Sequence, residues 1–278
     1  MMQLFHQVSQ ECSRITTERY STSFSSAINL LHKDLRTPIH NIYGFVRFAD
    51  EIVDTFHDFD KSLLLEEFRK STYEALDRGI SLNPILNSFQ LTVNAYHIDR
   101  GLIDAFLYSM EMDLSKRSYD RVGYEQYIYG SAEVVGLMCL YVFCDGNKDL
   151  YEQLKPSARS LGAAFQKVNF LRDVKADFEG LDRMYFPGCD FKNFSYKEKQ
   201  AIEADIQKDL EAAYEGILQL PFKARFGVYV AYKYYLSLFR KIKKIKPQKI
   251  LQQRIRIPDH SKLLILAKAG IRQQFNFL

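Results

Sequence analysis

The sequence predicts an all-α protein built as one large helical domain. Apolar residues recur at helical spacing along most of the chain, so each segment has one apolar face. Only 13 glycines and 7 prolines occur in 278 residues, which suits long helices better than a turn-rich β fold. Apolar residues make up 47% of the chain, and no repeat or linker divides it. Residues 1–278 are therefore expected to share a single core.

Each predicted helix rests on its periodicity and on its boundary signals. Thr37 followed by Pro38 is typical of a helix start, with threonine as the cap and proline in the first turn. The apolar residues that follow recur every three or four positions as far as Phe56. Turns are expected at 185–188 and 254–258, the second with a short extended piece. The predicted helices are 38–56, 62–78, 81–93, 99–112, 121–143, 157–178, 196–218, 222–245 and 259–274.

Net charge and cysteine content exclude several classes of protein. A net charge of +4 fits an anionic substrate or a membrane surface, but it is too small for a nucleic-acid-binding protein. The four cysteines lack the CxxC spacing of a zinc site. Because residues 1–10 show no leader pattern, a reducing cytoplasmic location is expected. We expect no spanning helix, because the best candidate, 263–267, is far shorter than the roughly 20 apolar residues that a span needs.

The helix predicted over 38–56 carries an acidic stripe apart from its apolar face. At 100° per residue, Tyr43, Arg47, Asp50 and Asp54 fall within an arc of about 60°. Two carboxylates at i and i+4 repel each other unless a cation lies between them. Mg²⁺ takes oxygen ligands and also binds phosphate, so the pair is a candidate metal site. The alternative is an ordinary solvated face on which Arg47 pairs with its acidic neighbours.

A second acidic stripe lies on the helix predicted over 157–178. Gln166, Asn169, Asp173 and Asp177 share one face about 80° wide. Asparagine is a poor helix former, so its place one turn before an acidic pair favours a role as a metal ligand or a phosphate-binding group. Two helices with such stripes are expected to face each other in a bundle and to bind metal between them.

Five short motifs resemble the squalene/phytoene synthase family, and they occur in the order and spacing typical of that family. The motifs are Tyr20-Ser21-Thr22-Ser23-Phe24, Tyr43-x3-Arg47-x2-Asp50-x3-Asp54, Tyr127-x-Tyr129-Gly130, Asn169-x2-Arg172-Asp173-x3-Asp177 and Arg183-x-Tyr185-x-Pro187. The resemblance extends over about residues 10–270. It implies an isoprenoid-synthase helical bundle with a central active-site cavity.

The resemblance implies an enzyme that joins two prenyl diphosphates head to head. In the family, one substrate ionises, the double bond of the second captures the allylic cation, and the resulting cyclopropyl diphosphate ionises again and rearranges. The departing diphosphate needs its charge neutralised, which metal ions, arginine and lysine provide. The implied cofactor is Mg²⁺, with Mn²⁺ as a substitute. The implied metal ligands are Asp50, Asp54, Asn169, Asp173 and Asp177.

The resemblance also implies roles for residues around the two acidic stripes. Those implied to bind substrate are Ser21, Ser23, Arg47, Arg172, Tyr185 and Arg254. Those implied to act in catalysis are Tyr43, Arg47, Tyr127, Gln166, Asn169 and Tyr235. For the serines the alternative role is a helix cap, and for the tyrosines it is a core aromatic ring.

The chain departs from the family pattern at three places. Glu51 stands in the first acidic motif where many relatives have a second aspartate, and Thr22 stands where a lysine is frequent. Ser131-Ala132-Glu133 replaces the common Ala-Gly that follows the tyrosine-rich motif, and the sequence offers no explanation for Glu133. These departures leave the metal motifs intact and concern the shape of the cavity.

Within the family, we expect the substrate to be geranylgeranyl diphosphate and the product to be phytoene. The stretch 127–142 resembles phytoene synthases more than dehydrosqualene synthases, and no C-terminal anchor like that of eukaryotic squalene synthases is seen. No glycine-rich dinucleotide fingerprint occurs, and no NADPH requirement is expected. The alternatives are squalene or dehydrosqualene synthesis from farnesyl diphosphate, a terpene cyclase, a head-to-tail prenyltransferase and a non-catalytic assembly-factor relative.

Basic and apolar residues within 239–249 predict peripheral contact with a membrane. Lysines at 241, 243, 244 and 246 would attract anionic lipids reversibly. The alternative is a solvated helix end, where cations are favoured by the negative end of the helix dipole.

Overall fold

The structure is a computed structural model of residues 1–278. It describes residues 1–116, 118–180, 184–189, 194–252, 254–256, 258, 265–266 and 269, with the side chains of 176–180 excepted. Within these ranges the chain is helical and contains no strand, apart from one isolated bridge between Ser118 and Met184. The predicted all-α class is confirmed. The helix predicted over 259–274 lies almost wholly outside the described residues.

The described helices run in chain order from α1 to α12, with one short π-helix, η1, between α7 and α8. Their bounds are α1 Met2–Tyr20, α2 Thr22–Ile28, α3 Lys33–Asp54, α4 Lys61–Arg78, α5 Pro84–Tyr96, α6 Arg100–Ser115, α7 Arg121–Ile128, η1 Tyr129–Glu133, α8 Val134–Cys144, α9 Lys148–Gly180, α10 Tyr196–Gln219, α11 Phe222–Lys243 and α12 Pro247–Ile250.

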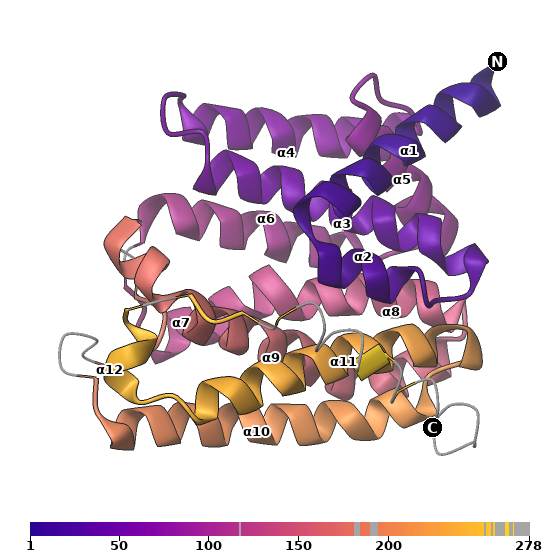
Figure 1. Ribbon diagram of the computed structural model, residues 1–278. Helices are drawn as coiled ribbons and strands as arrows, with labels where there is room; N and C mark the ends of the chain where they lie inside the picture. Colours follow the sequence, from indigo (N-terminus) through magenta and orange to yellow (C-terminus); the bar gives the residue numbers. More distant parts are fainter. Residues whose placement is uncertain are drawn as a thin grey trace.

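The helices form a layered bundle. Figure 1 shows α1, α4 and α5 on one side of the molecule, α10 on the opposite side, and α8 and α9 between them. The long helix α9 packs against α10, α8, η1 and α11, while α3 packs against α1, α5, α6 and α8. In the same view α3 and α9 both end at the left. Residues near the C-terminal ends of these two helices therefore lie at the same end of the bundle.

The core of the N-terminal half is organised around Phe45 of α3. Its side chain is fully buried and stacks face to face on Phe89 of α5, with ring centroids 3.9 Å apart. Phe68 and Phe106 contact the same ring, with centroids at 5.5 and 5.4 Å. Aromatic rings in such a cluster bury large apolar areas and add ring–ring attraction. This cluster fixes α3 against α4, α5 and α6.

Helices α1 and α2 were not predicted, because α1 reverses the usual pattern. Its buried residues are the small polar Ser9, Ser13 and Thr17, while Leu4 and Ile15 are exposed. The hydroxyl groups are paired within the bundle, as in the 2.6 Å hydrogen bond between the Oγ atoms of Ser13 and Ser88. Small side chains allow close helix contact, and hydrogen bonds compensate their burial. Apolar periodicity alone does not detect such a helix.

Two predicted helix starts are wrong by more than one turn. Helix α3 begins at Lys33, five residues before the predicted start, so Pro38 lies inside the helix. The backbone N–H of His32 donates to the carbonyl of Lys223 in α11, which positions this earlier start. Helix α9 begins at Lys148 and includes Pro156, although the prediction placed its start at 157. Pro38 is the sixth residue of α3 and Pro156 the ninth residue of α9, so each proline removes one backbone hydrogen bond from its helix.

The helix predicted over 121–143 is interrupted at its centre by η1. The stretch Arg121–Cys144 is nevertheless long and apolar enough to cross a membrane, since an 18-residue window within it has a mean hydropathy of 1.5. The sequence-based expectation that no such stretch exists missed it. Half of that window is buried inside the bundle, and η1 packs against α6 and α9. The central helix of a soluble bundle has the same composition, so length and hydropathy are weak grounds for a membrane span.

We expect Phe45→Ala to reduce the free energy of unfolding by about 3–5 kcal/mol, because it leaves a cavity among three aromatic rings. Denaturant unfolding followed by circular dichroism would measure the change. Phe222→Ala is the matched control, since Phe222 is 76% exposed and its loss should change stability by less than about 0.5 kcal/mol. Equal effects of the two substitutions would contradict this assignment of the core.

Candidate active site

A cavity of about 480 Å³ lies inside the bundle. Its wall is formed by side chains from α1, α2, α3, η1, α8, α9, α10 and α11, together with Arg254. Along α3 and α9 the lining residues change from mostly apolar to polar toward the C-terminal end of the helix. On α9 they run from Leu154 to Phe165 and then to Gln166, Asn169 and Arg172. The cavity is therefore apolar along most of its depth and polar at one end.

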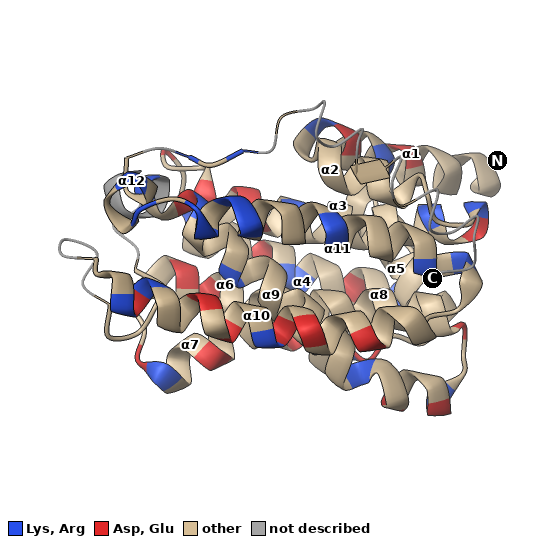
Figure 2. Ribbon diagram, turned by 60° about the horizontal axis from the view of Figure 1, so that its bottom comes forward, with Lys and Arg blue, Asp and Glu red and all other residues tan. Residues whose placement is uncertain are grey.

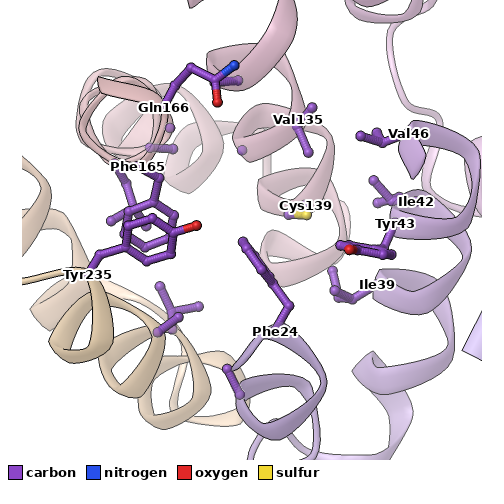
Figure 3. A pocket seen from close by; sticks show the side chains of 18 of the residues that line it. Phe24, Ile39, Ile42, Tyr43, Val46, Val135, Cys139, Phe165, Gln166 and Tyr235 are labelled. Carbon is purple, nitrogen blue, oxygen red and sulfur yellow. The ribbon is translucent and has the colours of Figure 1, made fainter. Parts of the chain in front are cut away.

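Four aromatic side chains lie where the polar end meets the apolar depth, and we call them the aromatic collar: Phe24, Tyr43, Phe165 and Tyr235. Figure 3 shows Phe24 rising between Tyr235 on one side and Tyr43 on the other. The rings of Phe165 and Tyr235 stack with centroids 3.7 Å apart, and Phe24 lies 5.9 Å from Tyr43 and 6.3 Å from Tyr235. The faces of aromatic rings carry negative potential and attract cations.

At the polar end, α3 contributes Arg47 and Asp50 to the wall. The guanidinium of Arg47 lies 4.4 Å from the centre of the Tyr20 ring and pairs with Glu51, while its Nη1 lies 4.0 Å from Asp50 Oδ2. Its Nε is buried and has no hydrogen-bond partner among the described residues. Glu51 thus holds the Arg47 side chain beside the cavity, and one buried N–H donor of Arg47 stays unsatisfied within the described part of the chain.

The carboxyl group of Asp50 lies in an unusually negative environment. Burial raises its pKa to about 8, with further contributions from the negative charges of Asp54 and Asp113, and Arg47 opposes the shift. A carboxyl group with this pKa lacks a sufficient positive partner. A divalent cation would supply it, because hard cations prefer carboxylate oxygens. Asp54 lies one turn further along α3, outside the described lining of the cavity.

On the opposite side of the polar end, Asp173 is held by two arginines. Arg172 Nη2 lies 2.5 Å from its Oδ2, and Arg254 Nε lies 2.8 Å from its Oδ1. Both arginines line the cavity, whereas Asp173 lies behind them. Charge-assisted pairs of this kind are strong, so Asp173 positions the two guanidinium groups at the wall. The side chain of Asp177 lies outside the described residues, as does Arg183.

The polar residues of α9 and α11 meet beside the collar. Tyr235 donates a hydrogen bond to Asn169 Oδ1 at 3.3 Å. Burial raises the pKa of Tyr235, and burial raises the pKa of Tyr43 to about 12, so both hydroxyl groups stay neutral near pH 7. Ser21 caps α2 by accepting a hydrogen bond from the Phe24 backbone at 3.2 Å, and its side chain also lines the cavity. Ser21 can therefore cap α2 and face a substrate in the cavity at the same time.

Besides Asp54 and Asp173, three further predicted residues lie away from the described cavity wall: Ser23, Tyr127 and Tyr185. Tyr127 stacks on Tyr185 with centroids 5.2 Å apart and donates a 2.7 Å hydrogen bond to Asp113 Oδ2. Both tyrosines are buried, so their rings belong to the core. Asp113 was not predicted. The sequence contained one sign of it, namely that this acidic residue follows directly after the predicted helix 99–112, next to its apolar face.

The donor set at the polar end fits a divalent cation bound together with an anion. Asp50 and Asp54 offer carboxylate oxygens, while Arg47 and Arg254 offer N–H donors at the cavity. Among the described residues no cluster of three or more acidic, histidine or cysteine side chains forms a complete metal site. A cation here would complete its coordination with water or substrate oxygens, as Mg²⁺ commonly does with phosphates.

Comparison with known proteins agrees with this geometry. A model of the squalene/phytoene synthase family matches residues 17–260. The chain belongs to this family. The resemblance predicted from the five motifs is thereby confirmed, and the enzymes of this family are prenyltransferases that use a divalent metal.

Among curated proteins, the chain is similar to phytoene synthase of Arthrospira platensis, with 26% identity covering 95% of this chain and 93% of that protein. It is also similar to presqualene diphosphate synthase of Rhodopseudomonas palustris, with 28% identity covering 60% and 58% of the two chains. The solved structure of a dehydrosqualene synthase bound to a ligand covers 97% of this chain and 98% of its own, with a TM-score of 0.82 and 17% identity. This last likeness confirms the isoprenoid-synthase helical fold.

We expect Asp50→Asn to abolish turnover and to stabilise the metal-free protein. The raised pKa means that the native state favours the protonated carboxyl, so this stabilisation is complete below the ordinary pKa of 3.8 and is lost as pH rises through about 8. Asparagine cannot ionise and avoids that loss. The gain in thermal midpoint over wild type, measured in chelator, should therefore be larger at pH 9 than at pH 5.

Added Mg²⁺ should stabilise the wild type and leave Asp50→Asn almost unchanged. Asp58→Asn is the control, because Asp58 lies in the exposed turn after α3. Full turnover of Asp50→Asn, or full activity of the wild type in excess chelator, would contradict a metal role for this residue.

Proposed function

We propose that the protein condenses two molecules of geranylgeranyl diphosphate head to head to give phytoene, with Mg²⁺ as cofactor and without NADPH. Family membership supports the reaction class, and the shape of the cavity supports the substrate. The observation that carries the choice of substrate is the length of the apolar wall.

That length comes from α9. Leu154 and Phe165 are 11 positions apart on the helix, which corresponds to about 17 Å at a rise of 1.5 Å per residue. An extended carbon chain advances about 1.2 Å per bond, so the main chain of a geranylgeranyl group spans about 18 Å and that of a farnesyl group about 13 Å. The apolar wall therefore matches the longer chain. At its far end Leu154, Ile217 and Leu220 lie on the wall.

Binding of the diphosphate would use the cations at the polar end. Arg47, Arg172 and Arg254 reach the wall from α3, α9 and the segment after α12. Their positive charge stabilises a diphosphate more strongly as it departs and gains charge, and this difference lowers the barrier to ionisation. When bound at Asp50 and Asp54, Mg²⁺ would neutralise part of the same charge. The prenyl chains would extend past the aromatic collar into the apolar depth.

After ionisation the cation would lie at the collar. Ring faces of Phe165 and Tyr235 offer negative potential there, and Gln166 and Asn169 offer amide oxygens. Tyr43 and Tyr235 are neutral near pH 7, so neither would trap the cation as a phenolate. Apolar side chains along the remaining wall exclude water, which would otherwise quench the cation.

The test is incubation of the purified protein and Mg²⁺ with geranylgeranyl diphosphate, with farnesyl diphosphate and with an equal mixture of the two. We expect a C40 hydrocarbon to form without NADPH and to dominate in the mixture, with at least a tenfold preference. A C30 product that dominates, or a product that requires NADPH, would overturn the substrate assignment. Absence of any condensation would overturn the function and favour a non-catalytic assembly role.

We also propose reversible contact with anionic membranes through the C-terminal end of α11. Figure 2 shows basic residues along α11 and at α12. Lys241, Lys243, Lys244 and Lys246 are exposed, and Lys241 Nζ donates to the carbonyl of Arg256 at 2.7 Å. That contact joins the basic surface to the segment that brings Arg254 to the cavity. Phe239 and Ile242 are buried, so the contact would be electrostatic and would not insert apolar side chains.

We expect the protein to float with vesicles of phosphatidylcholine and phosphatidylserine at low salt and to be released at about 0.5 M salt, because screening weakens each lysine contact. Neutral vesicles are the lipid control. Lys241→Gln with Lys244→Gln should reduce flotation at least threefold without changing the thermal midpoint. Absence of binding at any salt concentration would disprove membrane contact.

A further inference from the structure

The π-helix η1 brings a polar group into a wall that is otherwise apolar on this side. Residues Tyr129–Glu133 form η1, and Ser131 and Ala132 of this turn line the cavity. The next lining residues along α8 are Val135, Gly136 and Cys139. π-Helices insert one residue into a helix and often occur at functional sites. Ser131 is therefore the first position at which this wall changes from apolar to polar.

The turn is firmly fixed. Glu133 is paired with Arg159 of α9, with 2.5 Å between its Oε2 and the guanidinium Nε, and the same guanidinium lies 5.2 Å from the centre of the Tyr129 ring. Gly162 of α9 lies directly against the turn, since a Cβ atom there would come within 2.6 Å of the Ala132 carbonyl oxygen. Glu133 thus anchors η1 to α9, which explains an acidic residue that the sequence left unexplained.

Ser131 makes two hydrogen bonds, and together they determine the orientation of Gln166. Its hydroxyl donates its single proton to the backbone carbonyl of Tyr127 at 2.7 Å. The hydroxyl oxygen is then an acceptor, and it receives Nε2–H of Gln166 at 3.1 Å. The amide nitrogen is held against the wall, and the amide oxygen is left on the cavity side, as Figure 3 shows.

An amide oxygen at this place would face the reacting carbons. Gln166 adjoins Phe165 of the collar and lies one turn before Asn169, at the boundary between the polar end and the apolar depth. The negative end of a fixed dipole stabilises positive charge without reorganising, and its effect is large where water is excluded. A flipped amide would instead present N–H groups to the cation and raise its energy.

We propose that Ser131 is a positioning residue that orients the Gln166 carbonyl toward the cation of the second ionisation. The inference rests on the proposed condensation. In that step the carbon–oxygen bond of the cyclopropyl diphosphate breaks, diphosphate leaves with the electron pair, and the rearranged cation loses a proton to the departed diphosphate. The orientation of Gln166 therefore governs how much cyclopropyl diphosphate proceeds to hydrocarbon.

The experiment measures the ratio of cyclopropyl diphosphate to hydrocarbon in single turnovers with Mg²⁺ and geranylgeranyl diphosphate. Ser131→Ala should increase this ratio by about three- to tenfold, and Ser131→Thr, which keeps the hydroxyl, should restore the wild-type ratio. Ser26→Ala is the matched control, because the Ser26 hydroxyl likewise donates to the carbonyl one turn before it, that of Thr22 at 2.7 Å, and Ser26 lies outside the described cavity lining. In a Gln166→Leu background, Ser131→Ala should have no further effect.

An unchanged ratio in Ser131→Ala would overturn the proposal, as would a loss of total turnover with the ratio unchanged. A second measurement does not depend on the reaction. The side-chain ¹⁵N amide resonance of Gln166 in the ligand-free protein should shift in Ser131→Ala and stay unchanged in Ser26→Ala; no shift would overturn the orientation. If the wild type forms no product while this resonance does shift, the proposed function fails and the orienting contact is still supported.

Discussion

The burial of Asp50 among other carboxyl groups is the constraint on which the functional end of the bundle depends. Burial raises the pKa of Asp50 to about 8, the charges of Asp54 and Asp113 contribute to the shift, and the nearest cation, Arg47, is already held by Glu51. Such a group is stable only with a bound proton or a bound cation. The opposite side balances this charge with Arg172 and Arg254, which Asp173 orients. One end of the cavity therefore suits a metal and a diphosphate together.

The rest of the bundle keeps an apolar volume open behind that charged end. Two clusters of aromatic rings hold the helices around this volume in place. Phe45 and its neighbours fix α3, while Tyr127 of α7 and Phe170 of α9 both stack on Tyr185 and so fix α7 against α9, with the rings of Phe170 and Tyr185 4.0 Å apart. Gly162 packs closely against Ala132, so η1, which lines the cavity, is held in one position. A rigid wall costs little reorganisation when charge develops, which is the physical basis of electrostatic catalysis.

Much of the fold and part of the site could be predicted from particular residues. The acidic stripes on α3 and α9 identified Arg47, Asp50, Gln166 and Asn169, which do line one cavity. Helix α1 escaped prediction because its buried face is made of serine and threonine. Asp113 escaped because its importance depends on Tyr127 and Asp50, which are distant in sequence. Metal ligation by Asp50, Asp54, Asn169, Asp173 and Asp177 stays a prediction.

The sequence by itself determined the helical class, the family and the identity of the charged residues, because periodicity and i, i+4 spacing act within single helices. Only the tertiary structure decided which of those residues share a surface. It placed Tyr127 in the core with Asp113, turned Asp173 toward two arginines, and gave Glu133 a partner in Arg159. It also set Ser131 beside Gln166. These contacts join residues on different helices, and their geometry depends on how the helices pack, which no local pattern encodes.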